Sequence, residues 1–326
     1  MKNKQIPATD RDSTPQDSVQ TDPGVTETRN PESMSIDALS AREIAELMNR
    51  EDTRVALAVE RELNAIARVM ESVADAFRAG RRLIYVGAGT SGRLGVLDAS
   101  ECPPTFHSDP SQVVGLIAGG HEALVRSIEG AEDNPDVGAE DLDKLSPQPG
   151  DVVIGIATSG RTPFVIGALA RAKERGATTV ALVCNDSTAL KGQVDVLIQP
   201  VVGPEVVTGS TRLKAGTATK MVLNMITTGA MVLNGKTYEN LMVDLRASNE
   251  KLRKRSQRIV SELTGLDANR AVDLLQHCDG ELKTAIVCEL GELEPAVARE
   301  RLESVGGRLR DALTGLPSSG ERLESS

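Results

Sequence analysis

The chain has 326 residues, a formal net charge of −10 at pH 7, no tryptophan and only 2% aromatic residues. The acidic balance with scattered basic residues argues against nucleic acid as a partner, and the few aromatics argue against stacking platforms for bases or polysaccharides. Three histidines, and four cysteines without C-x-x-C spacing, argue against a metal centre or a disulfide framework and favour reduced thiols in the cytoplasm. We expect no membrane span and no secretory leader, because no stretch is long and apolar enough for either.

Composition changes along the chain divide it into four predicted segments. Residues 1–24 are polar and proline-containing, which predicts a disordered arm. Residues 25–244 begin with helical patterns and continue with alternating strand and helix patterns, which predict one α/β domain. Residues 245–313 show short amphipathic periods broken by glycines, typical of a small helical bundle. Residues 314–326 are rich in Ser, Gly and Glu and predict a frayed tail.

Hydrophobic periodicity predicts the elements of the α/β domain. Apolar residues recurring every three or four positions predict one helix from Ser40 through Met48 and another over about 53–79. Short β-rich runs then alternate with helical stretches such as 162–175. These runs predict strands at 82–86, 113–117, 151–156, 178–183 and 194–198. Such alternation predicts a parallel sheet with helices on both faces.

A glycine-rich loop follows the first predicted strand and opens a predicted helix. Its sequence, Gly87-Ala88-Gly89-Thr90-Ser91-Gly92, lets backbone N–H groups and a helix N-terminus face an anion. The pattern also fits a dinucleotide fingerprint, which needs an acidic residue at the end of the second strand. That strand ends in Gly119-Gly120 instead, and Glu122 lies beyond the turn. The hydroxyls of Thr90 and Ser91 therefore favour a terminal phosphate over the pyrophosphate of a nicotinamide cofactor.

The Thr-Ser-Gly-Arg sequence of residues 90–93 recurs at 158–161, again directly after a predicted strand and before a predicted helix. Either copy alone is a common helix N-cap, because Ser, Thr and Gly are favoured there. The repetition predicts one shared phosphate-and-sugar site, to which the second loop contributes Ser159, Gly160 and Thr162.

Two further stretches stand out. Glu101 follows the first glycine-rich loop and precedes Pro103-Pro104. A stiffened carboxylate directly after a phosphate-binding loop predicts chemistry on a phosphorylated small molecule. Residues 214–233 form a long apolar stretch, and a helix that is apolar all round is buried on all sides. This predicts either a central core helix or part of a homodimer.

Several separate segments together resemble the N-acetylmuramic acid 6-phosphate etherases, of the sugar isomerase (SIS) domain superfamily. The resemblance runs from about Thr26 to Leu313 and is most specific in Asp98–Thr105. The other segments that carry it are Thr26-Glu27-x-x-Asn30 with Ser35-Ile36-Asp37, residues 87–106, Ala118-Gly119-Gly120, Glu129–Asp133, Ala157–Pro163 and Val206–Thr217. The chain departs from the resemblance at His107, where we expect glycine, and in a longer segment before Val25.

The resemblance implies an α/β fold of the SIS type. Its parallel sheet is flanked by helices on both faces, with N-terminal helices and a small C-terminal helical bundle. It also implies elimination of D-lactate from open-chain N-acetylmuramic acid 6-phosphate, followed by addition of water to give N-acetylglucosamine 6-phosphate. The C1 aldehyde acidifies the C2 proton, so one carboxylate can remove that proton while a carboxylic acid protonates the departing ether oxygen. This chemistry requires no metal or redox cofactor.

Carried over residue by residue, the resemblance assigns Glu101 as the acid that protonates lactate and Glu132 as the base. Spacing alone gives Glu132, like Glu129 and Asp133, only the character of a solvated helix end. Glu205 is a third candidate, because related sugar isomerases place a catalytic glutamate before a helical Thr/Lys segment; a structural charge near Lys214 is the equal alternative. The residues expected to bind the substrate or its phosphate are Gly89, Thr90, Ser91, Ser159, Gly160, Thr162, Glu205, Ser210 and Lys214.

Two other functions stay open at this stage. An aldose–ketose phosphosugar isomerase shares the sheet, the phosphate loops and a glutamate base, but needs no acid such as Glu101 aimed at a C3 leaving group. A non-catalytic sugar-phosphate regulator carries two such domains in a longer chain, whereas this chain has strands for one sheet. The resemblance further implies a homodimer, with each site completed by the second chain and a phosphorylated amino sugar as substrate.

Overall fold

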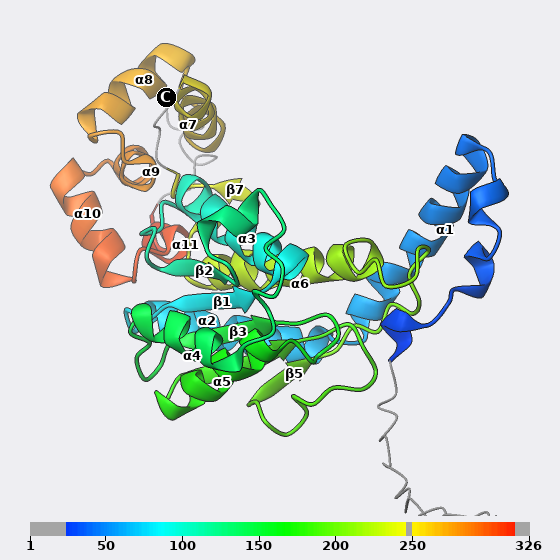
Figure 1. The fold of residues 1–326 in the computed structure, drawn as a ribbon. Coiled ribbons are helices and arrows are strands. Elements are labelled where there is room, and N and C mark those ends of the chain that lie inside the picture. Colours follow the sequence, from blue (N-terminus) through cyan, green and yellow to red (C-terminus); the bar gives the residue numbers. More distant parts are fainter. Residues whose placement is uncertain (1–23, 246–249, 317–326) are drawn as a thin grey trace, which may run out of the picture.

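A five-stranded parallel sheet forms the centre of the molecule (Figure 1). The computed structural model describes residues 24–245 and 250–316. The strands are β1 (Leu83–Gly87), β2 (Val113–Ile117), β3 (Val152–Ile156), β4 (Thr178–Leu182) and β5 (Val196–Ile198), in the spatial order β2-β1-β3-β4-β5. The predicted parallel sheet is confirmed. The predicted N-terminal disorder and most of the predicted tail concern residues outside the described ranges.

The sheet is buried on both faces by helices. The helices of this part are α1 (Ala41–Glu60), α2 (Leu63–Arg78), α3 (Gly89–Phe106), α4 (Pro135–Lys144), α5 (Pro163–Glu174) and α6 (Lys214–Leu233). Tyr85 faces a core shared with α2, α3 and α6, whereas its neighbour Val86 faces a core shared with α4 and α5. Successive strand residues point to opposite faces, so one apolar run supplies both cores.

The N-terminal helices differ from the prediction at their junction. The predicted break between residues 48 and 53 is wrong, because α1 continues to Glu60 and the chain turns at Arg61-Glu62. No glycine or proline marks this turn. The Glu62 carboxylate instead accepts a hydrogen bond from the Gln199 backbone N–H at 2.9 Å, just after β5. A contact between residues so distant in the sequence leaves no local pattern from which to predict it.

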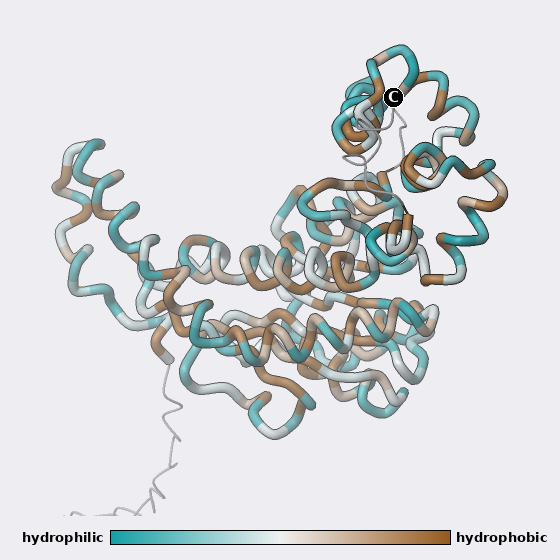
Figure 2. The backbone as a smooth tube through the Cα atoms, turned by 180° about the vertical axis from the view of Figure 1, so that it is seen from behind, coloured by the Kyte–Doolittle hydropathy of each residue, from teal (hydrophilic) through white to brown (hydrophobic). Residues whose placement is uncertain are grey.

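The first half of α1 extends away from the body together with the short turns before it (Figure 1). Three 3-10 turns precede α1: η1 (Val25–Glu27), η2 (Pro31–Ser33) and η3 (Ile36–Ala38). Ser40 and Glu43 begin the helix with a capping box, in which each side chain binds the other's backbone N–H. Residues 31–50, here named the projecting segment, carry mainly hydrophilic residues at their far end in Figure 2.

The apolar helix α6 is covered within the chain. Its residues Val222, Leu223 and Ile226 are fully buried in the core that α6 shares with α2 and α3. Exposure of large apolar side chains is confined to its last residues, Val232 at 45% and Leu233 at 36%. The apolar character of α6 is therefore satisfied as a core helix and does not require a second subunit.

A second apolar cluster lies beyond the end of α6. A two-stranded antiparallel hairpin leads into it, followed by five short helices (Figure 1). These elements are β6 (Thr237–Tyr238), β7 (Leu241–Met242), α7 (Glu250–Thr264), α8 (Ala268–His277), α9 (Leu282–Gly291), α10 (Pro295–Ser304) and α11 (Leu309–Leu313). Hairpin residues from Tyr238 onward pack with the C-terminal helices. The four-part division of the chain stays a prediction.

Candidate active site

The two Thr-Ser-Gly-Arg loops lie side by side at one edge of the sheet. They follow β1 and β3, which are neighbouring parallel strands, so both loops leave the same carboxyl edge. The Ser91 Oγ lies 3.4 Å from the Thr158 Oγ1. Helix α3 begins at Gly89 and helix α5 begins after Thr162, so two helix N-termini meet there. The helix dipoles at such a place favour an anion such as a phosphate.

Close backbone packing fixes the first loop. A Cβ added at Gly92 would lie 2.7 Å from the Gly87 carbonyl oxygen and 2.6 Å from the Ile117 side chain. Only glycine fits at this approach, because real Cβ atoms are not found at such distances from other atoms. The N-terminus of α3 is therefore held directly against the end of β1.

A cavity of about 270 Å³ opens beside the first loop. Gly89, Arg93, Arg126 and Glu132 are among the residues that line it. The Arg93 guanidinium donates to the carbonyl oxygens of Leu124 at 3.1 Å and Arg126 at 2.9 Å, so Arg93 holds the cavity wall in place. Larger cavities lie between α7 and α8, beside α5, and between residues 29–37 and 206–208, and the residues of neither loop line them.

Glu132 is tied to the second loop through its backbone. Its carbonyl oxygen accepts a hydrogen bond from the Phe164 N–H at 3.0 Å, in the first turn of α5. Its side chain is exposed and lines the same cavity as Gly89. The structure therefore brings together Glu132, the first loop and the start of α5, although these segments are separated in the sequence.

Glu101 lies apart from this cavity. It is exposed on the outer face of α3, next to Leu97, which is 49% exposed. Gly89 and Glu101 are more than three turns apart on one helix, or about 18 Å at 1.5 Å per residue. In a hexose 6-phosphate that carries an ether at C3, only a few bonds separate C3 from the phosphate. One small substrate held at the loops therefore cannot reach the Glu101 of the same chain.

Near Glu101 on the same helix, a partly buried set of hydrogen bonds joins α3 to its neighbours. The Asp98 carboxylate accepts hydrogen bonds from the Tyr85 hydroxyl at 2.8 Å and the Thr227 hydroxyl at 3.2 Å. Burial raises the pKa of Asp98, although these two hydrogen bonds oppose the shift. These hydrogen bonds join β1, α3 and α6. The sequence analysis placed Asp98 within the most specific segment but gave it no role.

Glu205 and Lys214 lie in a different, buried environment. The Glu205 carboxylate accepts hydrogen bonds from the backbone N–H groups of Lys214 at 3.0 Å and Ala215 at 2.9 Å, at the start of α6. Burial raises the pKa of Glu205, although both hydrogen bonds act in the opposite direction. The Lys214 Nζ lies 2.7 Å from the Glu51 carboxylate. Neither side chain lines the cavity of Glu132.

Two further predicted residues, Ser210 and Thr90, lie near the start of α6. Ser210 is half-buried in the loop before α6. The Thr90 methyl group would lie 3.8 Å from a Cβ added at Gly216, which places Thr90 beside the first turn of α6. Thr90 thus lies where the first loop meets the start of α6. The assigned roles of Ser210, Glu205 and Lys214 stay predictions.

The sequence analysis missed Asn185, which is fully buried beside the second loop. Its side-chain oxygen accepts from the Val25 N–H at 2.8 Å, and its Nδ2 lies 3.5 Å from the Ser159 carbonyl oxygen. A Cβ added at Gly24 would lie 2.0 Å from the Asn185 Nδ2. The N-terminal segment therefore packs against the second loop. An asparagine after a strand is too common in sequences to have indicated this contact.

The described residues also bear on metals, thiols and membranes. Within residues 24–245 and 250–316, no three His, Cys, Asp or Glu side chains gather closely enough to hold a metal ion. All four cysteines lie within these ranges and are buried and unpaired. None of the helices in these ranges combines the length and apolar character needed to cross a membrane.

Comparison with known proteins gives consistent relatives. A family model for the N-terminal SIS domain of the glucokinase regulatory protein matches residues 65–173, and an SIS domain model matches residues 139–229. The N-acetylmuramic acid 6-phosphate etherase of Rhodopirellula baltica is 57% identical over 284 residues, covering 87% of this chain and 94% of the relative. That of Aliivibrio salmonicida is 53% identical over 289 residues, covering 89% and 96%. Among solved structures, a protein from Bacteroides fragilis named as a phosphosugar isomerase involved in capsule formation aligns with TM-score 0.44 and 20% identity, covering 59% of this chain and 89% of that one.

Proposed function

The chain belongs to the N-acetylmuramic acid 6-phosphate etherase family, and from this membership we propose that it cleaves the D-lactyl ether of N-acetylmuramic acid 6-phosphate. The products are N-acetylglucosamine 6-phosphate and D-lactate. Identity above 50% over most of both chains carries the proposal. The meeting of two hydroxyl-rich loops with a glutamate at one edge of the sheet supports it.

The substrate phosphate would bind between the starts of α3 and α5. Ser91, Ser159 and Thr162 offer hydroxyl groups there, and Gly89 and Gly160 allow the backbone to approach. Hydrogen bonds to a charged group contribute about 1.5–3 kcal/mol each. Binding the phosphate at this place directs the sugar toward the cavity that Glu132 lines.

Glu132 would act as the base on the open-chain sugar. It removes the C2 proton, and the electron pair forms the C2–C3 double bond as the C3–O bond breaks. The departing lactate oxygen takes a proton from Glu101. Water then adds at C3 and a proton returns to C2, which restores the saturated aldehyde. General acid–base catalysis of this kind contributes typically 10²–10⁴-fold for each group.

The position of Glu101 leads us to propose a homodimer with shared sites. A separation of about 18 Å along α3 places it beyond reach of a substrate at its own chain's loops. In a dimer with two-fold symmetry, the exposed outer face of α3 can instead meet the loops of the second subunit. Each site would then combine the Glu132 of one chain with the Glu101 of the other.

A direct assay separates this proposal from its alternatives. The protein is incubated with N-acetylmuramic acid 6-phosphate, and free D-lactate and N-acetylglucosamine 6-phosphate are measured; we expect equal amounts of both. An aldose–ketose isomerase would release no lactate from this substrate, whose C2 carries an acetamido group, and would instead convert an aldose phosphate with a C2 hydroxyl into a ketose phosphate. A regulator such as the glucokinase regulatory protein, whose N-terminal SIS model matches residues 65–173, would bind a sugar phosphate without turnover.

The state of the thiols supports a location in the cytoplasm. All four cysteines are buried free thiols, including Cys278 and Cys288, whose sulfur atoms lie 3.7 Å apart. Proteins of oxidising compartments commonly pair their cysteines, whereas the cytoplasm keeps thiols reduced. We therefore place the proposed reaction in the cytoplasm, and finding the native protein with a disulfide or in an exported fraction would contradict this placement.

A further inference from the structure

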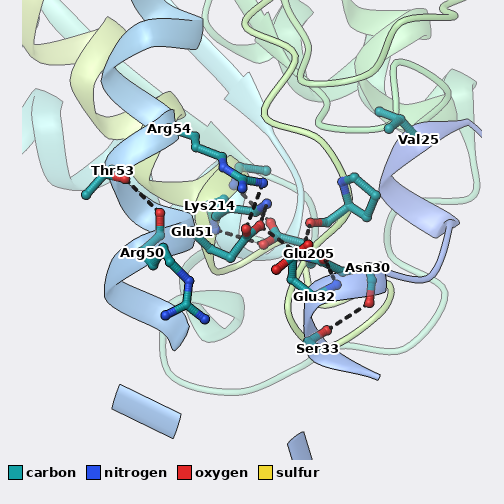
Figure 3. A network of polar contacts seen from close by, with 12 residues as sticks. Val25, Asn30, Glu32, Ser33, Arg50, Glu51, Thr53, Arg54, Glu205 and Lys214 are labelled. Carbon is teal, nitrogen blue, oxygen red and sulfur yellow. Dashed lines mark hydrogen bonds and ion pairs between the residues drawn. The ribbon is translucent and has the colours of Figure 1, made fainter. Parts of the chain in front are cut away.

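A buried polar network joins the N-terminal segment to the start of α6 (Figure 3). The Glu51 Oε2 accepts from the Lys214 Nζ at 2.7 Å and from the Asn30 Nδ2 at 2.8 Å. The Glu51 and Lys214 side chains are only 1% and 2% exposed. Asn30 also donates to the Pro204 carbonyl at 3.2 Å, and Arg54 reaches the second Glu51 oxygen at 2.8 Å from the rim.

This network already neutralises the charges that could attract a phosphate to α6. The Lys214 ammonium is paired with Glu51 in the protein interior. The first N–H groups of α6 are taken up by the Glu205 carboxylate, which occupies the place where an anion would bind. The start of α6 is therefore a completed ion site, whereas no side chain caps the start of α3.

The same network lies next to the substrate loops on two sides. Residues 24–30 are held at one end by Asn185, which contacts the Ser159 carbonyl. They are held at the other end by Asn30, through Glu51 and Lys214. Lys214 in turn begins the helix whose first turn lies beside Thr90.

We propose that Glu51, Lys214 and Asn30 are positioning residues, which fix residues 24–30 and the first turn of α6 around the two phosphate loops. In this assignment Lys214 acts through Glu51 and does not contact the substrate phosphate. The assignment rests on the proposed function, because it takes the two loops as the sugar-phosphate site.

Three variants test the assignment: Lys214→Met, Glu51→Gln and the two combined. Removing one partner of a buried ion pair leaves an uncompensated charge, whereas removing both leaves none. Affinity for N-acetylglucosamine 6-phosphate is measured by calorimetry, and KM and melting temperature are measured alongside. We expect each single variant to bind roughly tenfold more weakly and the combined variant to recover to within about threefold of wild type.

Lys254→Met provides a matched control. Lys254 pairs with Glu250 on α7, and both side chains are more than 70% exposed. Losing this solvated pair should change neither affinity nor KM. A decrease there equal to that of Lys214→Met would show that the effect does not depend on the buried network, and would overturn the assignment.

A ligand role for Lys214 gives a different pattern. The combined variant would then regain its melting temperature but stay as weak in binding as Lys214→Met. If Lys214→Met does not fold, Glu51→Gln decides alone, because it frees the Lys214 ammonium. Affinity for N-acetylglucosamine 6-phosphate would stay unchanged or become tighter if Lys214 is a ligand. It would become weaker if Lys214 is a positioning residue. Wild-type protein that binds the product but releases no lactate would contradict the etherase proposal and leave these affinities valid.

Discussion

Glu101 and Glu132 have opposite proposed tasks, and the difference can be measured residue by residue. Glu132 would remove the C2 proton and Glu101 would protonate the leaving oxygen. We expect Glu101→Gln to abolish D-lactate release while exchange of the C2 proton with solvent deuterium stays measurable by NMR. In Glu132→Gln both processes should decrease together, by about 10²–10⁴-fold.

Each outcome has a clear counterexample. Near-native lactate release by Glu101→Gln would show that another group is the acid. Intact C2 exchange in Glu132→Gln would move the base elsewhere, and Glu205 would be the next carboxylate to test. Its two hydrogen bonds to backbone N–H groups make it the less available base in this conformation.

The conformation of His107 predicts how its substitution changes the stability of the protein. It ends α3 in the left-handed region, with φ 50, and its N–H donates to the Pro103 carbonyl at 3.0 Å. A side chain in this conformation costs roughly 1–2 kcal/mol, and glycine avoids that cost. We expect His107→Gly to raise the free energy of unfolding by about 1 kcal/mol in urea denaturation. His107→Ala keeps a Cβ and serves as the control, and an equal gain there would contradict the explanation.

Residues differ in how far the sequence predicts them. The repeated Thr-Ser-Gly-Arg loops could be paired in advance, because carboxyl ends of neighbouring parallel strands meet at one edge. The environment of Lys214 could not, because its partner Glu51 is 163 positions away. Asn185 likewise acts through a backbone contact to Val25 that no local pattern marks.

At the scale of elements, the backbones of α4 and α5 pack in direct contact. This contact fixes the position of the loop that carries Glu132, which precedes α4. A Cβ added at Gly167 would lie 1.9 Å from the Pro135 carbonyl oxygen, and Pro135 begins α4 just after the Glu132 loop. We expect Gly167→Ala to destabilise the protein by about 1–3 kcal/mol, as overpacking does. It should also lower kcat, because α4 moves relative to α5. Gly265→Ala is the control: with open space around it and a φ of +78, it should lower stability through backbone strain alone and leave kcat unchanged.

The measurement is thermal unfolding together with the rate of lactate release at saturating substrate. An unchanged rate in Gly167→Ala, with the expected loss of stability, would mean that helix packing does not position Glu132. An unchanged stability would contradict the close approach itself.

The ion pair between α1 and α6 gives a pH dependence. Burial alone would raise the pKa of Glu51, but the hydrogen bonds from Lys214 and Asn30 outweigh it, so the pKa lies below the ordinary 4.5. A lowered folded-state pKa contributes stability above the unfolded value, and this contribution is lost as pH falls through the folded value. The melting-temperature difference between wild type and Glu51→Gln should therefore be constant near neutrality and shrink below about pH 4.5.

Titrating groups outside the ion pair are common to both proteins, whereas Lys214 loses its partner in Glu51→Gln. Glu205 and Arg54 are near Glu51 and are present in both proteins. A difference that stays constant from pH 7 to pH 3.5 would show that the Glu51 carboxylate carries no net stabilisation in the folded state.

Element boundaries show where sequence patterns stop being sufficient. Alternating strand and helix periods predicted all five parallel strands, because each buried strand is a short apolar run. The junction of α1 and α2 was misplaced, because its turn depends on the contact of Glu62 with Gln199. Periodicity identifies which face of a helix is apolar, but a turn stabilised by a distant segment has no signature of its own.

At the scale of the whole molecule, the apolar helix α6 and the proposed acid Glu101 give different support for a second subunit. Composition left α6 open as either a core helix or part of a homodimer, and its burial by α2 and α3 supports the core helix. The separation of Glu101 from the loops gives the stronger reason for a dimer, and it required the position of α3 to be known. The exposed residues of the projecting segment offer further surface for a second chain (Figures 1 and 2).

Mixed dimers test the shared site directly. Glu101→Gln and Glu132→Gln proteins are each inactive, and they are mixed under conditions that exchange subunits. If one site combines Glu132 of one chain with Glu101 of the other, a mixed dimer has one site with both native glutamates and one with neither. Random exchange makes half of the dimers mixed, so about a quarter of wild-type lactate release should return. If both glutamates of a site come from one chain, no activity returns.

The reciprocal mixture gives the matched control. Wild-type protein is exchanged with the double variant that carries both substitutions. In a shared site every mixed dimer is inactive, because each site has one substituted glutamate, so total activity should drop to about half. In an unshared site the wild-type chain keeps its activity and the total does not change. Light scattering on both mixtures must show twice the chain mass, and a fully active monomer at nanomolar concentration would contradict the shared site altogether.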